Sequence, residues 1–288
     1  MLSDPIVEAP GSRMSPIRRI LAVATVIAAG LLAACSETRT DAAETLPVDE
    51  LYAAANTSLN TGNYARAARF YTRLIARFPF GRYTEQAELE LAFAQYRNDD
   101  YEEALSTTNR FIRTYPTHPR VDYAYYLRGL INFDREVGLL ERYIQSDATR
   151  RDLGFARQSF QDFGELLQRY PDSPYAADAR QRMVHLRNEL AQAELNIAQF
   201  YFRREAFIAA QSRAQYIVEN YQQTPQVGDA LAILTESYKR IGEDALSEQT
   251  RKVLQLNYPD HPYLTGSWPA RGSRWWQLIP IIGEDRAS

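Results

Sequence analysis

Aromatic residues recur at regular places along the chain, and most of them stand directly before a proline. Because proline cannot continue a helix, each of these places marks the end of a predicted helix. They are Phe78-Pro79, Tyr115-Pro116, Tyr170-Pro171, Tyr221 and Tyr258-Pro259. The first two aromatics, and likewise the last two, are separated by 37 residues, and the intervals between are longer. This spacing predicts one repeated unit with insertions in the middle of the chain.

A small residue lies at a constant distance before each of these aromatics. It stands eleven residues before the aromatic in every unit, as Ala67, Ala104, Ser159, Ala210 and Ser247. A small side chain at that place allows two paired helices to approach closely. The turns between paired helices are marked by Gly62-Asn63 and by Asn98-Asp99-Asp100. The constant offset favours repeated helix pairs over an unrelated bundle of α-helices.

The pattern resembles the tetratricopeptide (TPR) repeat. We therefore expect an all-α, TPR-like α-solenoid of about five helix pairs. The expected pairs are 48–79, 84–116, 119–171, 174–224 and 226–259. Leu139–Leu153 is interpreted as an insertion in the third pair, and the long helix from Pro174 to about Arg204 as a bridge between two halves. Such stacks leave a concave groove that typically holds an extended peptide or a partner domain.

The N-terminal residues follow the order of a secretory signal. Arg18 and Arg19 precede an uncharged run, Ile20–Ala34, which is shorter than the roughly 20 apolar residues of a transmembrane helix. The run ends in Leu32-Ala33-Ala34-Cys35, which resembles the lipobox of bacterial lipoproteins. The alternative is an ordinary signal peptide or membrane anchor with a chance cysteine. Since Cys35 is the only cysteine, we expect it to carry a covalent lipid, with no other cofactor.

Residues on either side of the run refine this prediction. Met14 is the expected start, because residues 1–13 contain acids that fit a signal poorly. By resemblance to the sorting rule of lipoproteins, Ser36 after the cysteine directs the chain to the outer membrane, facing the periplasm. The expected organisation is a signal peptide (1–34), a lipidated cysteine and flexible tether (35–47), a repeat domain (48–259) and a Trp-rich tail (260–288).

Catalytic and metal-binding motifs are missing from the sequence. It has no G-x-S-x-G, no glycine-rich phosphate loop and no C-x-x-C. The three histidines, His118, His185 and His261, lie far apart in sequence, so we expect no metal site. The 33 basic residues are scattered among 36 acidic ones, which argues against nucleic-acid binding. We therefore expect a binding scaffold and not an enzyme.

Two longer motifs carry a more specific resemblance. Phe78–Thr84 (FPFGRYT) is similar to the Y-P-F-G-P-Y-S loop of the BamD family, the TPR lipoproteins of the outer-membrane β-barrel assembly (Bam) machinery. Phe111–Tyr123 (FIRTYPTHPRVDY) is similar to its F-I-R-L-N-P-T-H-P-x-x-D-Y stretch. Arg128-Gly129-Leu130 and Ala156-Arg157 continue the likeness, which with the lipobox covers nearly the whole chain after the signal.

The resemblance implies a non-catalytic protein at the periplasmic face of the outer membrane. It implies binding to the POTRA domains of the barrel subunit BamA, to other Bam lipoproteins and to unfolded outer-membrane barrel proteins. Phe78, Phe80 and Tyr83 occupy places of the family's proposed substrate groove, and Arg213 that of an arginine that contacts BamA. Phe78 stands where the family has Tyr, so any hydrogen bond made by that hydroxyl is lost here, and Arg82 replaces a proline.

The C-terminal tail departs most from the family. It holds all three tryptophans, Trp268, Trp275 and Trp276. We interpret it as a cap on the last helix pair or as a docking site for a protein or the membrane interface.

Two other functions stay open for the whole chain. One is a periplasmic TPR coordinator of envelope or cell-wall machinery, whose relatives should lack the lipobox and the P-F-G and P-T-H-P motifs. The other is a lipid-anchored envelope enzyme, for which the sequence holds no motif.

Overall fold

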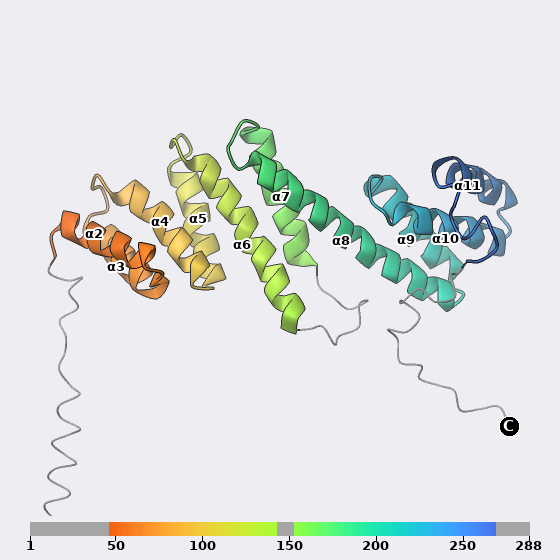
Figure 1. The fold of residues 1–288 in the computed structure, drawn as a ribbon, viewed down its shortest axis with the longest axis horizontal. Helices are drawn as coiled ribbons and strands as arrows, with labels where there is room; N and C mark the ends of the chain where they lie inside the picture. The colour runs from red at the N-terminus through yellow and green to blue at the C-terminus, as the bar shows by residue number, and fades with distance from the viewer. Residues whose placement is uncertain (1–45, 143–152, 269–288) are drawn as a thin grey trace, which may run out of the picture. The chain divides into compact units, whose positions relative to one another are not determined.

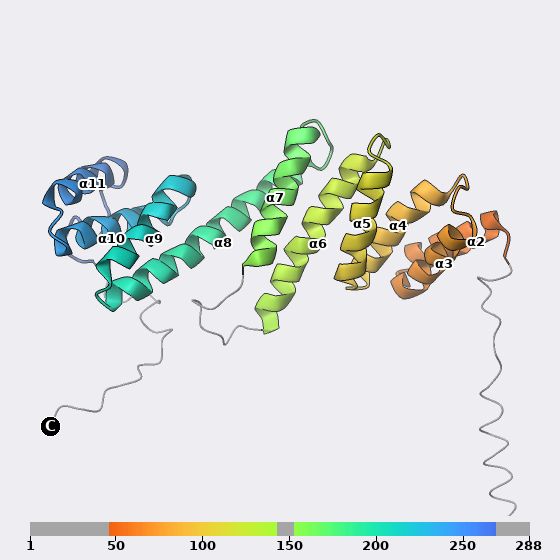
Figure 2. The ribbon, with the colours of Figure 1, turned by 180° about the vertical axis from the view of Figure 1, so that it is seen from behind.

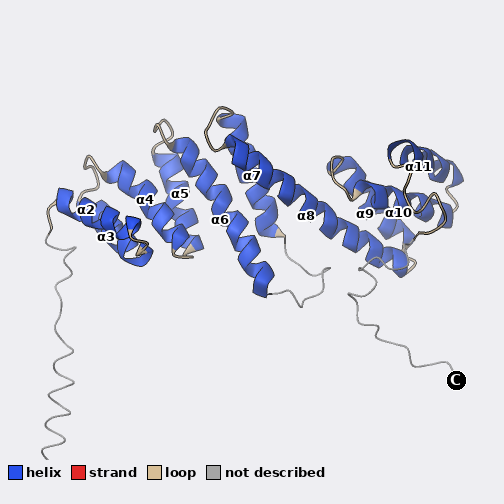
Figure 3. Cartoon of the chain, in the orientation of Figure 1, coloured by secondary structure: helices blue, strands red, loops and turns tan. Residues whose placement is uncertain are grey.

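The computed structural model describes residues 46–142 and 153–268 of the chain. These residues form ten α-helices and no strand (Figures 1 and 3). The helices are α2 (Val48–Asn60), α3 (Tyr64–Arg77), α4 (Thr84–Arg97), α5 (Tyr101–Thr114), α6 (Val121–Arg142), α7 (Gly154–Arg169), α8 (Ala176–Arg203), α9 (Phe207–Asn220), α10 (Val227–Arg240) and α11 (Asp244–Asn257). The prediction of an all-α, TPR-like fold of about five helix pairs is confirmed.

Each helix packs against its neighbours in sequence, as both views of the ribbon show (Figures 1 and 2). α2 pairs with α3, α4 with α5, α6 with α7, α8 with α9 and α10 with α11, and successive pairs also contact one another. All ten helices lie in one compact unit that begins at Val48. Because most contacts join sequence neighbours, the apolar face of each pair is buried by the next pair along the chain.

The aromatics that close the repeat units end helices as predicted. The backbone N–H of each one donates to the carbonyl four residues earlier and closes the last helical turn. They are the C-caps Phe78, Tyr115, Tyr170, Tyr221 and Tyr258.

The turns inside the pairs depend on positive φ angles, which few residues adopt readily. Gly62 has φ of 76° and Gly242 has φ of 83°. Asp99 and Glu205 adopt φ of 62° and 60° in the second and fourth pairs. In the first pair, Asn63 caps α3 by accepting the backbone N–H of Arg66 at 3.2 Å.

The small residues within the pairs are where the helices approach closely. Ala67, Ala104, Ser159 and Ala210 have no exposed surface, and Ser247 is half-buried. The two serines also hydrogen-bond across their pairs, and Ser159 Oγ donates to the carbonyl of Gly129 at 2.9 Å. Small size at this position therefore serves helix contact, as the repeat pattern predicted.

The long helix α8 belongs to two hydrophobic cores. Leu186 and Leu190 pack with residues of α4 to α7, and Leu195 and Ala198 pack with residues of α9 to α11. The predicted bridge is therefore present and runs from Ala176 to Arg203. Of the expected insertion, Leu139–Arg142 continues α6, and residues 143–152 lie outside the described residues.

Several predictions fall on residues that the structure does not describe. These include the start at Met14, the lipidated Cys35, the sorting residue Ser36 and the tail residues Trp275 and Trp276. Among the helices that are described, none is long and apolar enough to cross a membrane.

Candidate functional site

The loop between α3 and α4 contains the three aromatics of the predicted substrate groove, and one of them is fixed against α2. The ring of Tyr83 stacks on Tyr52 with centroids 4.4 Å apart and planes 11° from parallel. Its hydroxyl donates to Asp49 Oδ1 at 2.8 Å, and the guanidinium of Arg82 lies 4.5 Å from the ring centre. Tyr83 therefore joins this loop to the first helix of the chain's repeat domain.

Phe80 differs from Tyr83, because its side chain is fully exposed. The loop around it is held in place by Thr84 Oγ1, which donates to the carbonyl of Phe78 at 2.6 Å. Phe78 itself is half-buried, with the guanidinium of Arg77 5.0 Å from its ring centre. The ordered backbone of this loop therefore presents the Phe80 ring to solvent.

Arg213 lies on α9, far along the chain from this loop, and pairs within the protein. Its Nη1 is 3.0 Å from Oε2 of Glu194 on α8. The other carboxylate oxygen of Glu194 is 3.8 Å from Nη2 of Arg157 on α7. The predicted partner-binding arginine is thus part of a three-residue charge cluster, which no pattern in the sequence indicated.

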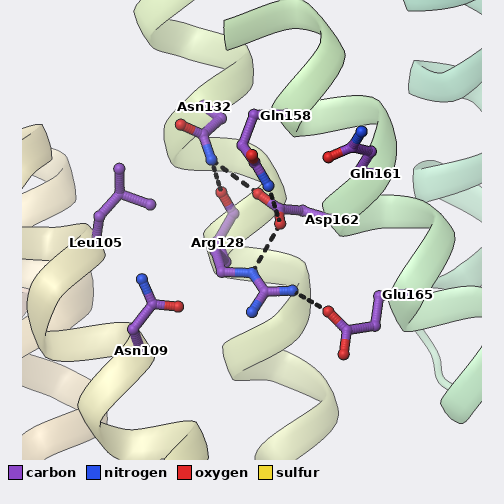
Figure 4. A pocket seen from close by; sticks show the side chains of 8 residues that line it. All are labelled: Leu105, Asn109, Arg128, Asn132, Gln158, Gln161, Asp162 and Glu165. Carbon is purple, nitrogen blue, oxygen red and sulfur yellow. Dashed lines mark hydrogen bonds and ion pairs between the residues drawn. The ribbon is translucent and has the colours of Figure 1, made fainter. Parts of the chain in front are cut away.

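A polar pocket opens between α5, α6 and α7 (Figure 4). It has a volume of about 430 Å³, and its lining residues are Leu105, Asn109, Arg128, Asn132, Gln158, Gln161, Asp162 and Glu165. At its centre Arg128 Nε lies 2.9 Å from Asp162 Oδ1, and Asn132 Nδ2 donates to Asp162 Oδ2 at 2.7 Å (Figure 4). The pocket wall is therefore a connected network of charges and amides.

Burial shapes the electrostatics of this network. It raises the pKa of Asp162, although Arg128 and hydrogen bonds from two amides act in the opposite direction. Burial would also raise the pKa of Glu165, but hydrogen bonds and charges of Arg128 and Arg169 lower it overall. Because one arginine of α6 pairs with two carboxylates of α7, the network links the two helices across the pocket wall.

The histidines occupy separate places. His118 and His261 lie in loops, and each accepts a backbone N–H at Nδ1 from the residue two positions later. Their Nε2 atoms face Glu85 at 3.8 Å and Asp229 at 3.3 Å. Residues 46–142 and 153–268 contain no group of three His, Cys, Asp or Glu side chains that could hold a metal ion.

The chain after α11 folds back over α10. Tyr263 donates from its hydroxyl to Glu236 at 3.2 Å, and Trp268 donates from Nε1 to Asp229 at 3.4 Å. The Trp268 ring also packs edge-on against Phe202 of α8, with centroids 5.5 Å apart. The first tryptophan of the tail therefore packs against α10 and α8.

These features define a helical-repeat binding protein with exposed aromatic and arginine side chains. The chain belongs to the YfiO family of outer membrane lipoproteins, whose model matches residues 44–254. The match spans all of the described helices except the end of α11.

Curated relatives carry a more particular name, outer membrane protein assembly factor BamD. The protein of that name from Xylella fastidiosa is 44% identical over 252 residues, covering 88% of this chain and 86% of the relative. That from Neisseria meningitidis is 43% identical and covers 80% and 86%. That from Vibrio cholerae is 39% identical and covers 81% and 96%. The predicted resemblance to the BamD family is confirmed.

Proposed function

We propose that this chain is a non-catalytic scaffold subunit of the outer-membrane β-barrel assembly machinery. The observation that carries the proposal is the 44% identity, over 88% of the chain, to a protein named as an outer membrane assembly factor. The stack of helix pairs supports it, because such stacks bind extended segments and partner domains. The partners are the POTRA domains of BamA, other Bam lipoproteins and unfolded barrel proteins.

The site residues have separate roles in this proposal. Phe80 gives an exposed ring to an unfolded barrel segment, whose strands alternate apolar and polar side chains. Tyr83 and Phe78 hold the loop that presents Phe80, and Tyr83 does so through Tyr52 and Asp49. Arg213 meets an acidic group of BamA from a different helix pair. Substrate and BamA thus bind at different parts of the scaffold.

The anchor in this proposal is a lipid on Cys35, which holds the scaffold at the periplasmic face of the outer membrane. It is supported by the lipobox-like sequence before Cys35 and by membership of a family of outer membrane lipoproteins. Several acyl chains make such attachment effectively permanent. Labelling with a radioactive fatty acid tests it: the label should appear in the wild type and be lost in Cys35→Ala.

Depletion of the chain in its host tests the function. We expect folded barrel proteins in the outer membrane to fall several-fold and their unfolded forms to accumulate in the periplasm. Re-expression of the wild type should restore them, and a lipoprotein unrelated to barrel assembly serves as the control for general envelope damage. Unchanged barrel levels together with an altered cell wall would favour the envelope-coordinator alternative.

A further inference from the structure

Glu194 occupies the point at which the two hydrophobic cores meet on α8. Leu190, four residues earlier, belongs to the core of α4 to α7, and Leu195, one residue later, belongs to that of α9 to α11. The Glu194 side chain is only 8% exposed. A carboxylate so buried needs positive partners, since burial without them strongly disfavours its charged form.

Two arginines provide those partners, one from the helix before α8 and one from the helix after it. Arg157 reaches Glu194 from α7, in the first half of the scaffold, and Arg213 reaches it from α9, in the second half. Both arginine side chains stay about half exposed, at 52% and 46%. Two guanidinium groups therefore flank one carboxylate, and the cluster carries a net positive charge that faces solvent.

Each guanidinium has five N–H donors in a planar fork, and the contact with Glu194 leaves most of them unused. A flexible arginine normally loses side-chain entropy when it binds, and an arginine already held by a buried carboxylate loses less.

A second acid, Glu219, lies on the same helix as Arg213. It lines an open pocket of about 400 Å³ together with Arg213, Ser212 and Tyr216. It is exposed and accepts a hydrogen bond from Gln215, so water screens its charge more than that of Glu194.

We propose that Arg157 and Arg213 form one binding site for an acidic side chain of the protein partner, and that Glu194 is the positioning residue that holds them together. The inference rests on the proposed function, which assigns Arg213 to the contact with BamA, and it adds two residues to that contact. It also places the contact across both cores, so that the partner touches both halves of the scaffold at once.

Binding of the full lipidated chain, in mild detergent, to the purified periplasmic domains of BamA tests this. The variants are Arg157→Gln, Arg213→Gln, Glu194→Gln and the double variant Glu194→Gln/Arg213→Gln. Arg180→Gln and Glu189→Gln are matched controls, because they make the same charge changes at positions of α8 that are not part of the cluster. Thermal unfolding of every variant checks the fold, and Arg157→Lys keeps the charge at position 157 if the glutamine variant unfolds.

We expect Arg157→Gln and Arg213→Gln each to weaken binding by about five- to twentyfold, as loss of a charged contact does. Arg157→Lys should fall between the wild type and Arg157→Gln, because it keeps the charge without the planar fork. Glu194→Gln should weaken binding in the wild type and cause a smaller further loss in Arg213→Gln, where only Arg157 is left for Glu194 to hold, and both controls should stay within about twofold.

If Arg157→Gln binds BamA as tightly as the wild type does, the two-arginine site is overturned and the proposed function stays intact. Tighter binding by Glu194→Gln would also overturn it, because Glu194 would then compete with the partner for Arg213. No binding by the wild type would overturn both the site and the proposed contact with BamA.

Discussion

Gly129 on α6 lies directly against the ring of Phe163 on α7. A Cβ placed on Gly129 would come within 2.5 Å of Cε1 of Phe163, a distance that side chains do not tolerate. The carbonyl of the same glycine accepts the hydroxyl of Ser159 at 2.9 Å. Gly129 therefore allows α6 and α7 to approach closely beside the polar pocket.

Replacement of this glycine should destabilise the protein. We expect Gly129→Ala to lower the free energy of unfolding by about 1–3 kcal/mol, because the buried Phe163 ring has little room to move. Gly164→Ala is the matched control, since its Cβ would meet only Met183 Cε at 3.8 Å. Alanine favours a helix over glycine, so the control should be neutral or more stable by up to about 1 kcal/mol. Equal losses for both in urea unfolding would contradict the packing role of Gly129.

Loss of Asp162 should leave Arg128 with the more exposed Glu165 as its remaining carboxylate partner. We expect Asp162→Ala to cost about 1–3 kcal/mol of unfolding free energy, because the buried donors of Arg128 and Asn132 lose their acceptor. The double variant Arg128→Met/Asp162→Leu removes both charges and should recover more than half of that loss. Chemical denaturation of the three proteins provides the comparison. A double variant no more stable than Asp162→Ala would show that the charge of Arg128, left without Asp162, does not cause the loss of stability in Asp162→Ala.

Substitution of Phe80 should weaken substrate binding, whereas substitution of Tyr83 should lower stability. Phe80→Ser removes a fully exposed ring, so we expect an unchanged melting temperature and weaker binding of an unfolded barrel peptide. Tyr83→Ala removes the stack on Tyr52 and the bond to Asp49, and should cost about 1–2 kcal/mol of stability. Calorimetry and peptide binding measure the two effects. Normal peptide binding by Phe80→Ser would remove Phe80 from the substrate site.

The part of the tail that stabilises the fold should end at Trp268. A chain that ends at Trp268 keeps the contacts with Phe202 and Asp229, so we expect its melting temperature to match the full chain. The same chain with Trp268→Ala should lose about 1–3 kcal/mol, as expected for a partly buried tryptophan. Assembly of the complex by the shorter chain then reports on residues 269–288 alone. A large loss of stability on removing only those residues would place the cap beyond Trp268.

Most of the fold was predictable from the sequence, because its signals are local and repeated. The closing aromatics and the small residues before them recur at a fixed offset, and each one ends a helix or sits between two helices in the structure. The long helix α8 was predictable because the helix expected in the sequence, from Pro174 to about Arg204, is unusually long. Local chemistry decides these features, so no knowledge of distant contacts was needed.

The site was less predictable, because its residues meet across long separations. Glu194 joins Arg157 and Arg213 from three different helices, and the only sequence signal was a single acid among Leu190, Leu195 and other buried residues. The sequence also did not indicate that Phe80 is exposed while Tyr83 is packed. Both are aromatics of one motif, and only the position of Tyr52 decides which one is packed.

Co-purification in mild detergent tests the central claim most directly, with the mature chain as the captured protein. We expect BamA in the eluate of the wild type, and several-fold less of it with Arg213→Glu, which places a second negative charge beside Glu194. A tagged lipoprotein of unrelated function controls for detergent carry-over. An eluate without BamA, but with enzymes or regulators of the cell wall, would contradict a role in barrel assembly.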